Sequence, residues 1–120
     1  MLTLELSPAS LIHIRATGQL LADDYRRFEP AFAAELDRRT PPVPLLLDMR
    51  GFVGWTPAGL LRDLQWDDRN RRTFSEIAVV GDKHWHRCIT VAGAPLFRAP
   101  MKFFGAGEQR QAEEWLAGRS

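Results

Sequence analysis

The chain has 120 residues, enough for one domain that folds without a disulfide or a metal ion. Its 45% hydrophobic and 26% charged residues are typical of a globular protein, and the net charge of +1 argues against a general nucleic-acid-binding protein. The single cysteine, Cys88, excludes an internal disulfide. We therefore expect one domain over residues 1–120, cytoplasmic and bacterial, without a signal peptide, a membrane span or nucleic-acid binding.

The first 40 residues predict two strands and a helix. Residues 2–7 and 11–16 alternate apolar and polar side chains across a short turn, which predicts an antiparallel hairpin that Gly18 ends. The pattern then changes to apolar residues three or four apart, which predicts a helix from residue 21 to about 39. Its apolar face would be formed by Leu21, Tyr25, Phe28, Phe32 and Leu36.

A buried strand at residues 43–49 forms the centre of the predicted fold. The run is apolar and is closed by Asp48, Arg50 and Gly51, which is typical of a strand buried on both faces. In open α/β sheets, ligands and partners bind at the carboxyl ends of the strands. Residues 48–54 therefore form the rim of the expected site.

The next segment predicts a helix and a second buried strand. Thr56 suits the N-cap and Pro57 the first position of a helix that extends to about residue 72. We expect its inner face to consist of Leu60, Leu61 and Leu64. Residues 75–81 form the second buried strand, which ends in Asp82.

Two further helices and a strand complete the prediction. A third helix from about His84 would bury Trp85, Cys88 or Ile89, and Ala92. Residues 101–104 predict a short strand, and a last helix opens after Gly105 and Gly107 and stops at Gly118. The inner face of that helix would hold Ala112, Trp115 and Leu116.

The predicted order is β-β-α-β-α-β-α-β-α. Strands that alternate with helices imply right-handed crossovers and a parallel sheet. The fold class is therefore α/β, with a mostly parallel sheet and a leading N-terminal hairpin.

Several motifs add a family resemblance. They are Asp24-Tyr25, Pro30, the 45–52 stretch Leu-Leu-Leu-Asp-Met-Arg-Gly-Phe, the 77–83 stretch Ile-Ala-Val-Val-Gly-Asp-Lys, Trp85, Phe103-Phe104, Ala112 and Trp115-Leu116. With the element order, they resemble the SpoIIAA-like group of STAS domains, in particular the small bacterial STAS/Sec14-like family. The likeness covers nearly the whole chain through core positions, so it implies the SpoIIAA-like (STAS) topology more strongly than any function.

The resemblance also bears on regulation. STAS domains that antagonise anti-sigma factors carry a pattern like Asp-Leu-Ser-Gly-Val-x-x-Ile-Asp-Ser-Ser-Gly-Leu. Aligned here, it starts at Asp48 and ends at Leu60, and the regulatory phosphorylated serine falls on Ala58. Alanine cannot accept a phosphate, and Thr56 is better explained as a helix cap. The resemblance therefore implies a binding surface without the serine switch.

His84, His86 and Cys88 have a spacing that suggests a metal site or a reactive thiolate. Residues two apart on a helix point about 200° apart, so the three cannot share one face. We expect no metal site and no catalytic cysteine, but a solvated helix start with a buried thiol.

Asp48 and Asp82 end two strands that we expect to be neighbours. Paired carboxylates can perform acid–base chemistry. Aspartates at strand ends more often cap turns, and we favour capping because neither a nucleophile nor a phosphate-binding loop accompanies the two residues.

Two clusters remain as candidates for binding. Arg62, Arg69, Arg71 and Arg72 form a basic patch that is either a solvated helix end or a contact for an acidic partner or phospholipid head group. Trp55 and its apolar neighbours lie at the carboxyl edge of the sheet, where they form a pocket, an interface or ordinary core.

Three functions follow, in decreasing order of preference. The first is a non-catalytic interaction or regulatory domain that binds a protein partner or forms a homodimer and acts through residues 48–60. The second is a carrier or sensor of a small apolar or lipid-like ligand, by resemblance to CRAL-TRIO lipid-transfer domains. The third is an enzyme. No cofactor is expected. The candidate ligand or partner surface consists of Asp48, Arg50, Phe52, Trp55, Thr56, Trp66, Asp82, Trp85 and Phe97.

Overall fold

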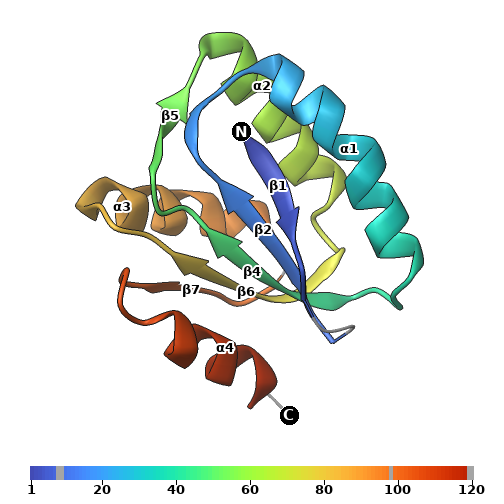
Figure 1. The fold of residues 1–120 in the computed structure, drawn as a ribbon, viewed down its shortest axis with the longest axis vertical. Coiled ribbons are helices and arrows are strands. Elements are labelled where there is room, and N and C mark those ends of the chain that lie inside the picture. The colour runs from blue at the N-terminus through green and yellow to red at the C-terminus, as the bar shows by residue number, and fades with distance from the viewer. Residues whose placement is uncertain (8–9, 98, 119–120) are drawn as a thin grey trace.

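A five-stranded sheet forms the centre of the computed structural model, which describes residues 1–7, 10–97 and 99–118 (Figure 1). Its strands lie in the order β1-β2-β4-β6-β7. β1 and β2 pair antiparallel, and every other neighbouring pair in the sheet is parallel. These strands are β1 (Leu2–Glu5), β2 (Ile12–Ala16), β4 (Val43–Asp48), β6 (Phe74–Val80) and β7 (Met101–Phe104). The predicted α/β class and the leading hairpin are confirmed.

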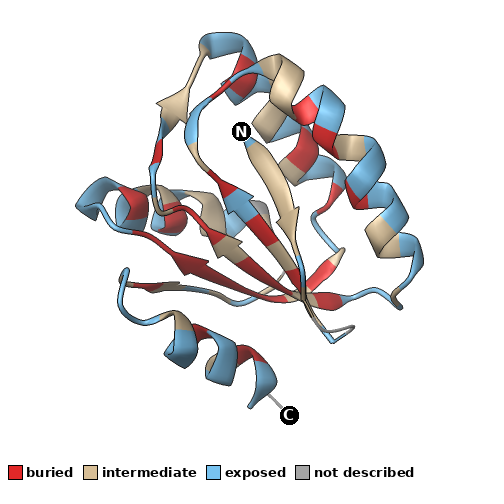
Figure 2. Cartoon of the chain, viewed as in Figure 1, coloured by how far each residue is buried: buried red, intermediate tan, exposed pale blue. Residues whose placement is uncertain are grey.

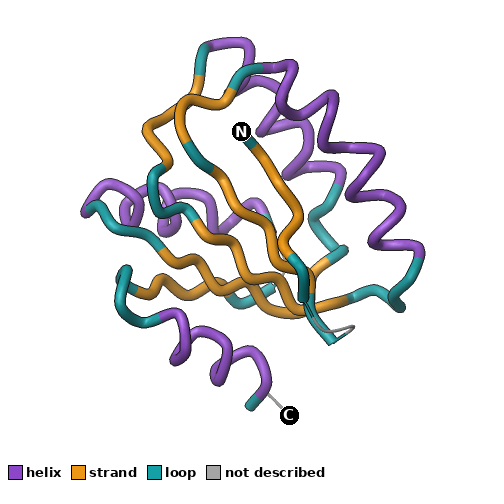
Figure 3. The backbone as a smooth tube through the Cα atoms, in the orientation of Figure 1, coloured by secondary structure: helices purple, strands orange, loops and turns teal. Residues whose placement is uncertain are grey.

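The helices cover both faces of this sheet, and the chain alternates between strand and helix (Figures 1 and 3). α1 (Ala22–Asp37) and α2 (Pro57–Arg69) pack side by side on one face, which α3 (His84–Gly93) joins through Ile89. α4 (Gln109–Ala117) packs on the opposite face against β4 and β6. No helix among the described residues is both long and apolar enough to cross a bilayer.

A second, two-stranded sheet was not predicted. β3 (Gly18–Leu20) and β5 (Phe52–Trp55) pair in parallel, so Gly18 begins a strand rather than ending the hairpin region. Gly18 has a φ of 64°, which the chain uses to turn from β2 into β3. This small sheet leads the chain from the carboxyl edge of the main sheet to the N-terminal ends of α1 and α2 (Figure 1).

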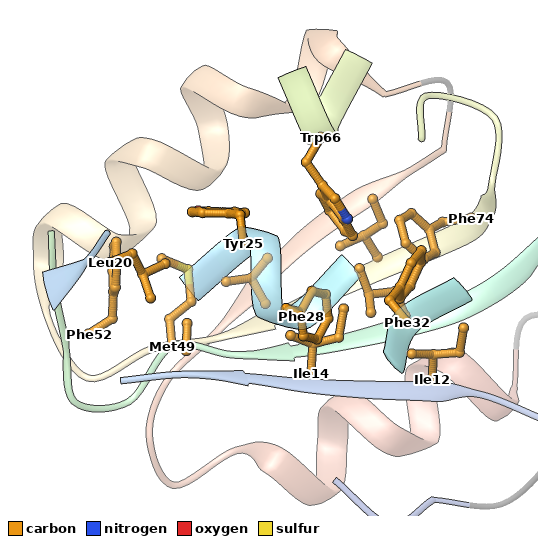
Figure 4. Packing of buried hydrophobic residues seen from close by; sticks show 14 of the residues in the cluster. Ile12, Ile14, Leu20, Tyr25, Phe28, Phe32, Met49, Phe52, Trp66 and Phe74 are labelled. Carbon is orange, nitrogen blue, oxygen red and sulfur yellow. The ribbon is translucent and has the colours of Figure 1, made fainter. Parts of the chain in front are cut away.

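Two hydrophobic clusters lie on the two faces of the main sheet. Figure 2 shows the buried residues concentrated in the central strands and along single faces of the helices. The larger cluster lies beneath α1, α2 and α3, where Phe28, Phe32, Trp66 and Phe74 make a chain of ring contacts (Figure 4). The smaller cluster lies beneath α4 and includes Ala112 and Leu116 as predicted.

The predicted inner face of α2 is wrong. Leu60, Leu61 and Leu64 are 41%, 57% and 46% exposed, whereas Gly59 and Trp66 are the buried residues of this helix. Gly59 faces inward because α2 lies so close to β3 that a Cβ atom there would come within 2.2 Å of the Leu20 carbonyl oxygen. The helix also ends at Arg69, before the predicted residue 72.

The predicted inner face of α3 is right only at Ile89, which packs against the larger cluster. Its buried residues are His86 and Thr90, while Trp85, Cys88 and Ala92 are exposed. The expected buried thiol is therefore at the surface. His86 replaces it because the imidazole can satisfy polar backbone groups that an apolar side chain would leave unpaired.

Candidate functional site

An apolar cavity of about 290 Å³ lies between the main sheet and the helices α1, α2 and α3. Leu45 and Ile77 of the central strands form part of its floor, and Phe28 lines it from α1. Trp66 points from α2 toward the sheet over these residues (Figure 4). Cavities of this kind, apolar with a few polar groups, are the usual form of small-molecule sites.

The end of the cavity near the carboxyl edge of the sheet is built from aromatic rings. Phe52 is 1% exposed and packs against Trp55 and Trp85, with ring centroids 4.8 and 5.5 Å away. The rings of Phe52 and Trp55 line the cavity directly. β5 positions both of them. Residues three apart in a regular strand point to opposite faces, but Gly54, with a φ of 132°, reorients the chain between Phe52 and Trp55.

One wall of the cavity is polar. The Tyr25 hydroxyl donates a hydrogen bond to Oδ1 of Asp63 at 2.7 Å and accepts one from Nε1 of Trp55 at 2.9 Å. Asp63 in turn shares a hydrogen bond with Asp67, one turn further along α2. All four side chains line the cavity. The network joins α1, α2 and β5 around the space that they enclose.

The pKa values of the acidic groups in this wall are shifted strongly upward. Burial, followed by the charge of Asp63, raises the pKa of Asp67 far above its ordinary range. Burial also raises the pKa of Asp63 and, together with the neighbouring carboxylate, that of Tyr25. The phenol therefore stays protonated at neutral pH, and Asp67, whose pKa is raised to about 9, keeps its proton there.

A separate polar cluster lies at the carboxyl end of β4. Oδ1 of Asp48 accepts hydrogen bonds from the backbone N–H and Nε of Arg50, both at 3.0 Å, and its Oδ2 accepts one from Nη2 at 2.8 Å. Arg50 also donates to the Ala106 carbonyl and contacts Gln109. Burial alone would raise the pKa of Asp48, but the hydrogen bonds and charge of Arg50 outweigh it and hold that pKa below its usual value. The ion pair thus fastens the end of β4 to the start of α4.

His86 occupies the corresponding position after β6 and is completely buried. Its Nδ1 accepts hydrogen bonds from the backbone N–H groups of Asp82 and Lys83, so the hydrogen of the neutral ring is on Nε2. Nε2 donates that hydrogen to the Phe52 carbonyl at 2.8 Å. Both ring nitrogens are therefore used to join the start of α3 to β5.

The comparisons with known proteins agree with this architecture. The family model described as SpoIIAA-like matches residues 11–117. This chain belongs to the SpoIIAA-like family. An uncharacterised protein of the DUF3478 family with a SpoIIAA-like fold, from Shewanella loihica PV-4, is 23% identical, with a TM-score of 0.81 over 97% of this chain and 92% of that one.

A second solved structure shares the fold at lower similarity. The anti-sigma factor antagonist SpoIIAA, in its unphosphorylated form, is 12% identical, with a TM-score of 0.62 over 94% of this chain and 96% of that one. No curated protein matches this chain in sequence. The family resemblance and the fold class expected from the sequence are thus confirmed.

The structure divides the predicted site residues of this SpoIIAA-like domain into two groups. Those that line the cavity are Phe52, Trp55, Trp66 and Phe97. The others do not line it: Asp48 and Arg50 form the ion pair beside the start of α4, Thr56 caps α2 by accepting a hydrogen bond from the Gly59 N–H, and Trp85 packs on Phe52. Oδ1 of Asp82 lies 3.3 Å from Nδ1 of His86.

The arrangements that would support a metal ion or an acid–base pair are not formed. His84 and Cys88 are exposed while His86 is buried, and the described part of the chain has no group of three or more His, Cys, Asp or Glu residues that could hold a metal ion. Asp48 is turned toward Arg50 and Asp82 toward His86. Asp48 therefore acts as a turn-capping ion-pair partner.

The residues that sequence reasoning missed are Tyr25, Asp63 and Asp67. The sequence predicts Tyr25 only as part of an apolar helix face and assigns neither aspartate to a site. A usable signal exists in the spacing: Gly59, Asp63, Trp66 and Asp67 recur at four, three and one residues, so they lie on one face of α2.

Proposed function

We propose that this SpoIIAA-like domain carries or senses a small apolar ligand, which binds in the cavity beneath α2. The observation that carries the proposal is the 290 Å³ cavity itself, with Phe52, Trp55, Trp66 and Phe97 in its lining. The polar groups in that lining come mainly from one wall, so a ligand would be apolar over most of its surface and polar at one end.

The size and the mouth of the cavity define the ligand further. An engineered apolar cavity of about 150 Å³ binds benzene, so this cavity has room for roughly two such rings. Leu60 and Leu64 both line the cavity and are more than 40% exposed. They therefore lie where the cavity meets solvent. We propose that ligands enter the cavity at this opening, beside Leu60 and Leu64.

Native mass spectrometry of freshly purified protein tests the carrier form of this proposal, because a retained ligand adds mass that extracts into organic solvent. Calorimetric titration with naphthalene tests binding directly, and we expect a single site. Leu64→Trp should block the mouth and weaken naphthalene binding, whereas Leu61→Trp should not, since Leu61 is exposed on the same helix but does not line the cavity. Equal effects of the two variants, or no binding by the wild type, would overturn the proposal.

A second candidate function is protein binding through α2. Three leucines of this helix are exposed, and an exposed apolar surface is typical of an interaction site. The structurally similar SpoIIAA is an anti-sigma factor antagonist. Here Ala58 would replace the phosphorylated serine, so partner binding would not be switched by phosphorylation at that position.

The simplest partner is a second copy of the chain, and its test is the oligomeric state. If α2 forms a homodimer, the wild type should elute and scatter light as a dimer, and Leu61→Glu should convert it to a monomer without loss of naphthalene binding. A wild-type monomer at high protein concentration would contradict the homodimer. Leu61→Glu would then remain useful for comparing the binding of other proteins.

A further inference from the structure

The polar wall of the cavity contains two neighbouring carboxyl groups. Asp63 and Asp67 lie one turn apart on α2, are hydrogen-bonded to each other and line an otherwise apolar space. Two neighbouring carboxylates that are sheltered from water cannot both be ionised without strong repulsion, and a cation placed against them would relieve that repulsion.

Among the described residues, no cation pairs with the two carboxyl groups. Arg62 and Arg69 flank the aspartates on α2, but both are paired with Glu29 of α1, at 3.1 and 3.5 Å. Across residues 1–7, 10–97 and 99–118, no lysine, arginine or histidine nitrogen lies within salt-bridge distance of Asp63 or Asp67. The donor that reaches the pair from another element is the neutral hydroxyl of Tyr25.

Trp66 supplies an independent indication of a ligand. Its side chain lines the cavity and is 9% exposed, and Nε1 is buried without a hydrogen-bond partner. A buried N–H group that lacks an acceptor is costly in free energy. A ligand that brings an acceptor atom to the indole would remove this cost.

We propose that the cavity binds a small apolar amine, whose ammonium group pairs with Asp63 and Asp67 and whose hydrogen-bond acceptor meets Trp66. This inference rests on the proposed function, because it names the ligand class for the same cavity. The positive charge of the amine would stabilise the ionised form of the aspartate pair inside the apolar cavity.

Three probes with one carbon skeleton test the charge preference: 3-phenylpropylamine, 3-phenylpropanol and 3-phenylpropanoate, each titrated into the wild-type protein by calorimetry. The amine should bind about tenfold to a hundredfold more tightly than the alcohol, because its hydrogen bonds are charge-assisted. The carboxylate should bind most weakly. Equal binding of amine and alcohol, or preferred binding of the carboxylate, would overturn the inference.

Variants of Asp63 and Asp67 test whether these residues cause the preference for the amine. In the double variant Asp63→Asn with Asp67→Asn, the amine should lose its advantage while the alcohol still binds, which also shows that the cavity is intact. Asp68→Asn is the matched control, since it removes one negative charge from an exposed position on the same helix. A double variant that keeps the preference for the amine would overturn the inference. If that variant does not fold, the wild-type comparison of the three probes still decides.

A fourth probe tests Trp66. The ether oxygen of 3-(4-methoxyphenyl)propylamine should strengthen binding about threefold to tenfold over 3-phenylpropylamine, and Trp66→Phe should abolish this gain. If the methoxy group strengthens binding equally in Trp66→Phe, then Trp66 does not donate a hydrogen bond to the ligand. Binding of naphthalene or the alcohol without an amine preference would refute only the inference, whereas failure of all apolar probes would refute the proposed function as well.

Discussion

Individual residues of this protein take their roles from the groups around them rather than from their chemical type. His84 and His86 are two positions apart, yet one is exposed and the other makes hydrogen bonds through both ring nitrogens. Asp48 and Asp67 are both half or more buried aspartates, but Arg50 lowers the pKa of the first while burial raises that of the second. Neither contrast can be read from residue identity.

His86 should contribute strongly to stability. His86→Ala would leave the N–H groups of Asp82 and Lys83 and the Phe52 carbonyl without their partner, so we expect a loss of roughly 2–4 kcal/mol in the free energy of unfolding, measured by urea denaturation. His84→Ala changes an exposed residue and should cost less than about 0.5 kcal/mol. Similar losses in the two variants would show that the buried network is not important.

The raised pKa of Asp67 implies that the stability of the protein depends on pH. Its pKa is raised on folding, so above a pH of about 4 the folded protein holds a proton that the unfolded chain releases. Stability should therefore fall as the pH rises toward the folded-state pKa. The Asp67→Asn variant has no carboxyl group at this position and so lacks this loss of stability. Its free energy of unfolding relative to the wild type should therefore increase from pH 5 to pH 8, by roughly 1–3 kcal/mol after screening by solvent.

Urea denaturation of both proteins at the two pH values measures this difference. Asp68→Asn is the control, because Asp68 is exposed and its relative stability should not change with pH. If the free energy of unfolding has the same pH dependence in the wild type and in Asp67→Asn, then Asp67 does not keep its proton in the folded state.

At the scale of the elements, the sequence predicted where helices and strands occur better than which way they face. The start of α2 was predicted correctly because Thr56 and Pro57 act locally, through a cap and a fixed φ angle. The prediction of its inner face is wrong because the apolar pattern favours leucines over Gly59, Asp63 and Trp66. These three face inward because their partners, Leu20, Tyr25 and Phe32, lie far away in sequence.

The β3–β5 sheet was missed for a similar reason. Its strands have three and four residues, and their glycines resemble loop signals. The pairing depends on β3 and β5 being brought together by β2 and β4, which are neighbours in the main sheet. No local pattern could have indicated it.

Gly59 should tolerate no side chain, which tests the close approach of α2 to β3. In Gly59→Ala the new Cβ would lie 2.2 Å from the Leu20 carbonyl oxygen, so we expect a loss of about 1–3 kcal/mol in the free energy of unfolding. Gly93→Ala is the matched helical control, since nothing lies within 4 Å of its Cβ, and it should be neutral or stabilising by up to about 1 kcal/mol. A neutral Gly59→Ala would mean that α2 can move away from β3 freely.

For the whole molecule, the order of elements and the family resemblance were predictable because each depends on local periodicity and on core positions along the chain. The cavity was not. It is the volume that remains when three helices pack on one face of the sheet, and its polar wall combines Tyr25, Asp63 and Trp55 from three elements. The sequence predicted aromatic residues for this region but could not distinguish a pocket from filled core.

The two faces of the sheet therefore differ in packing, and two buried alanines measure the difference. Ala16 on β2 lines the cavity, whereas Ala78 on β6 is fully buried in the cluster beneath α4. Ala16→Val adds two methyl groups toward the cavity and should raise the free energy of unfolding by about 1 kcal/mol. Ala78→Val adds the same groups to a filled core and should lower it by about 1–3 kcal/mol.

Ligand binding provides the second measurement on the same pair. The added methyl groups of Ala16→Val take volume from the cavity, so naphthalene should bind more weakly to this variant than to the wild type. Ala78→Val lies on the other side of the sheet and should leave naphthalene affinity unchanged wherever the protein is folded. Both variants lie in strands, so the difference between them cannot come from strand propensity. An Ala16→Val protein that is destabilised as much as Ala78→Val would show that the face beneath α2 is as tightly packed as the face beneath α4, and the proposed ligand site would lose its structural basis.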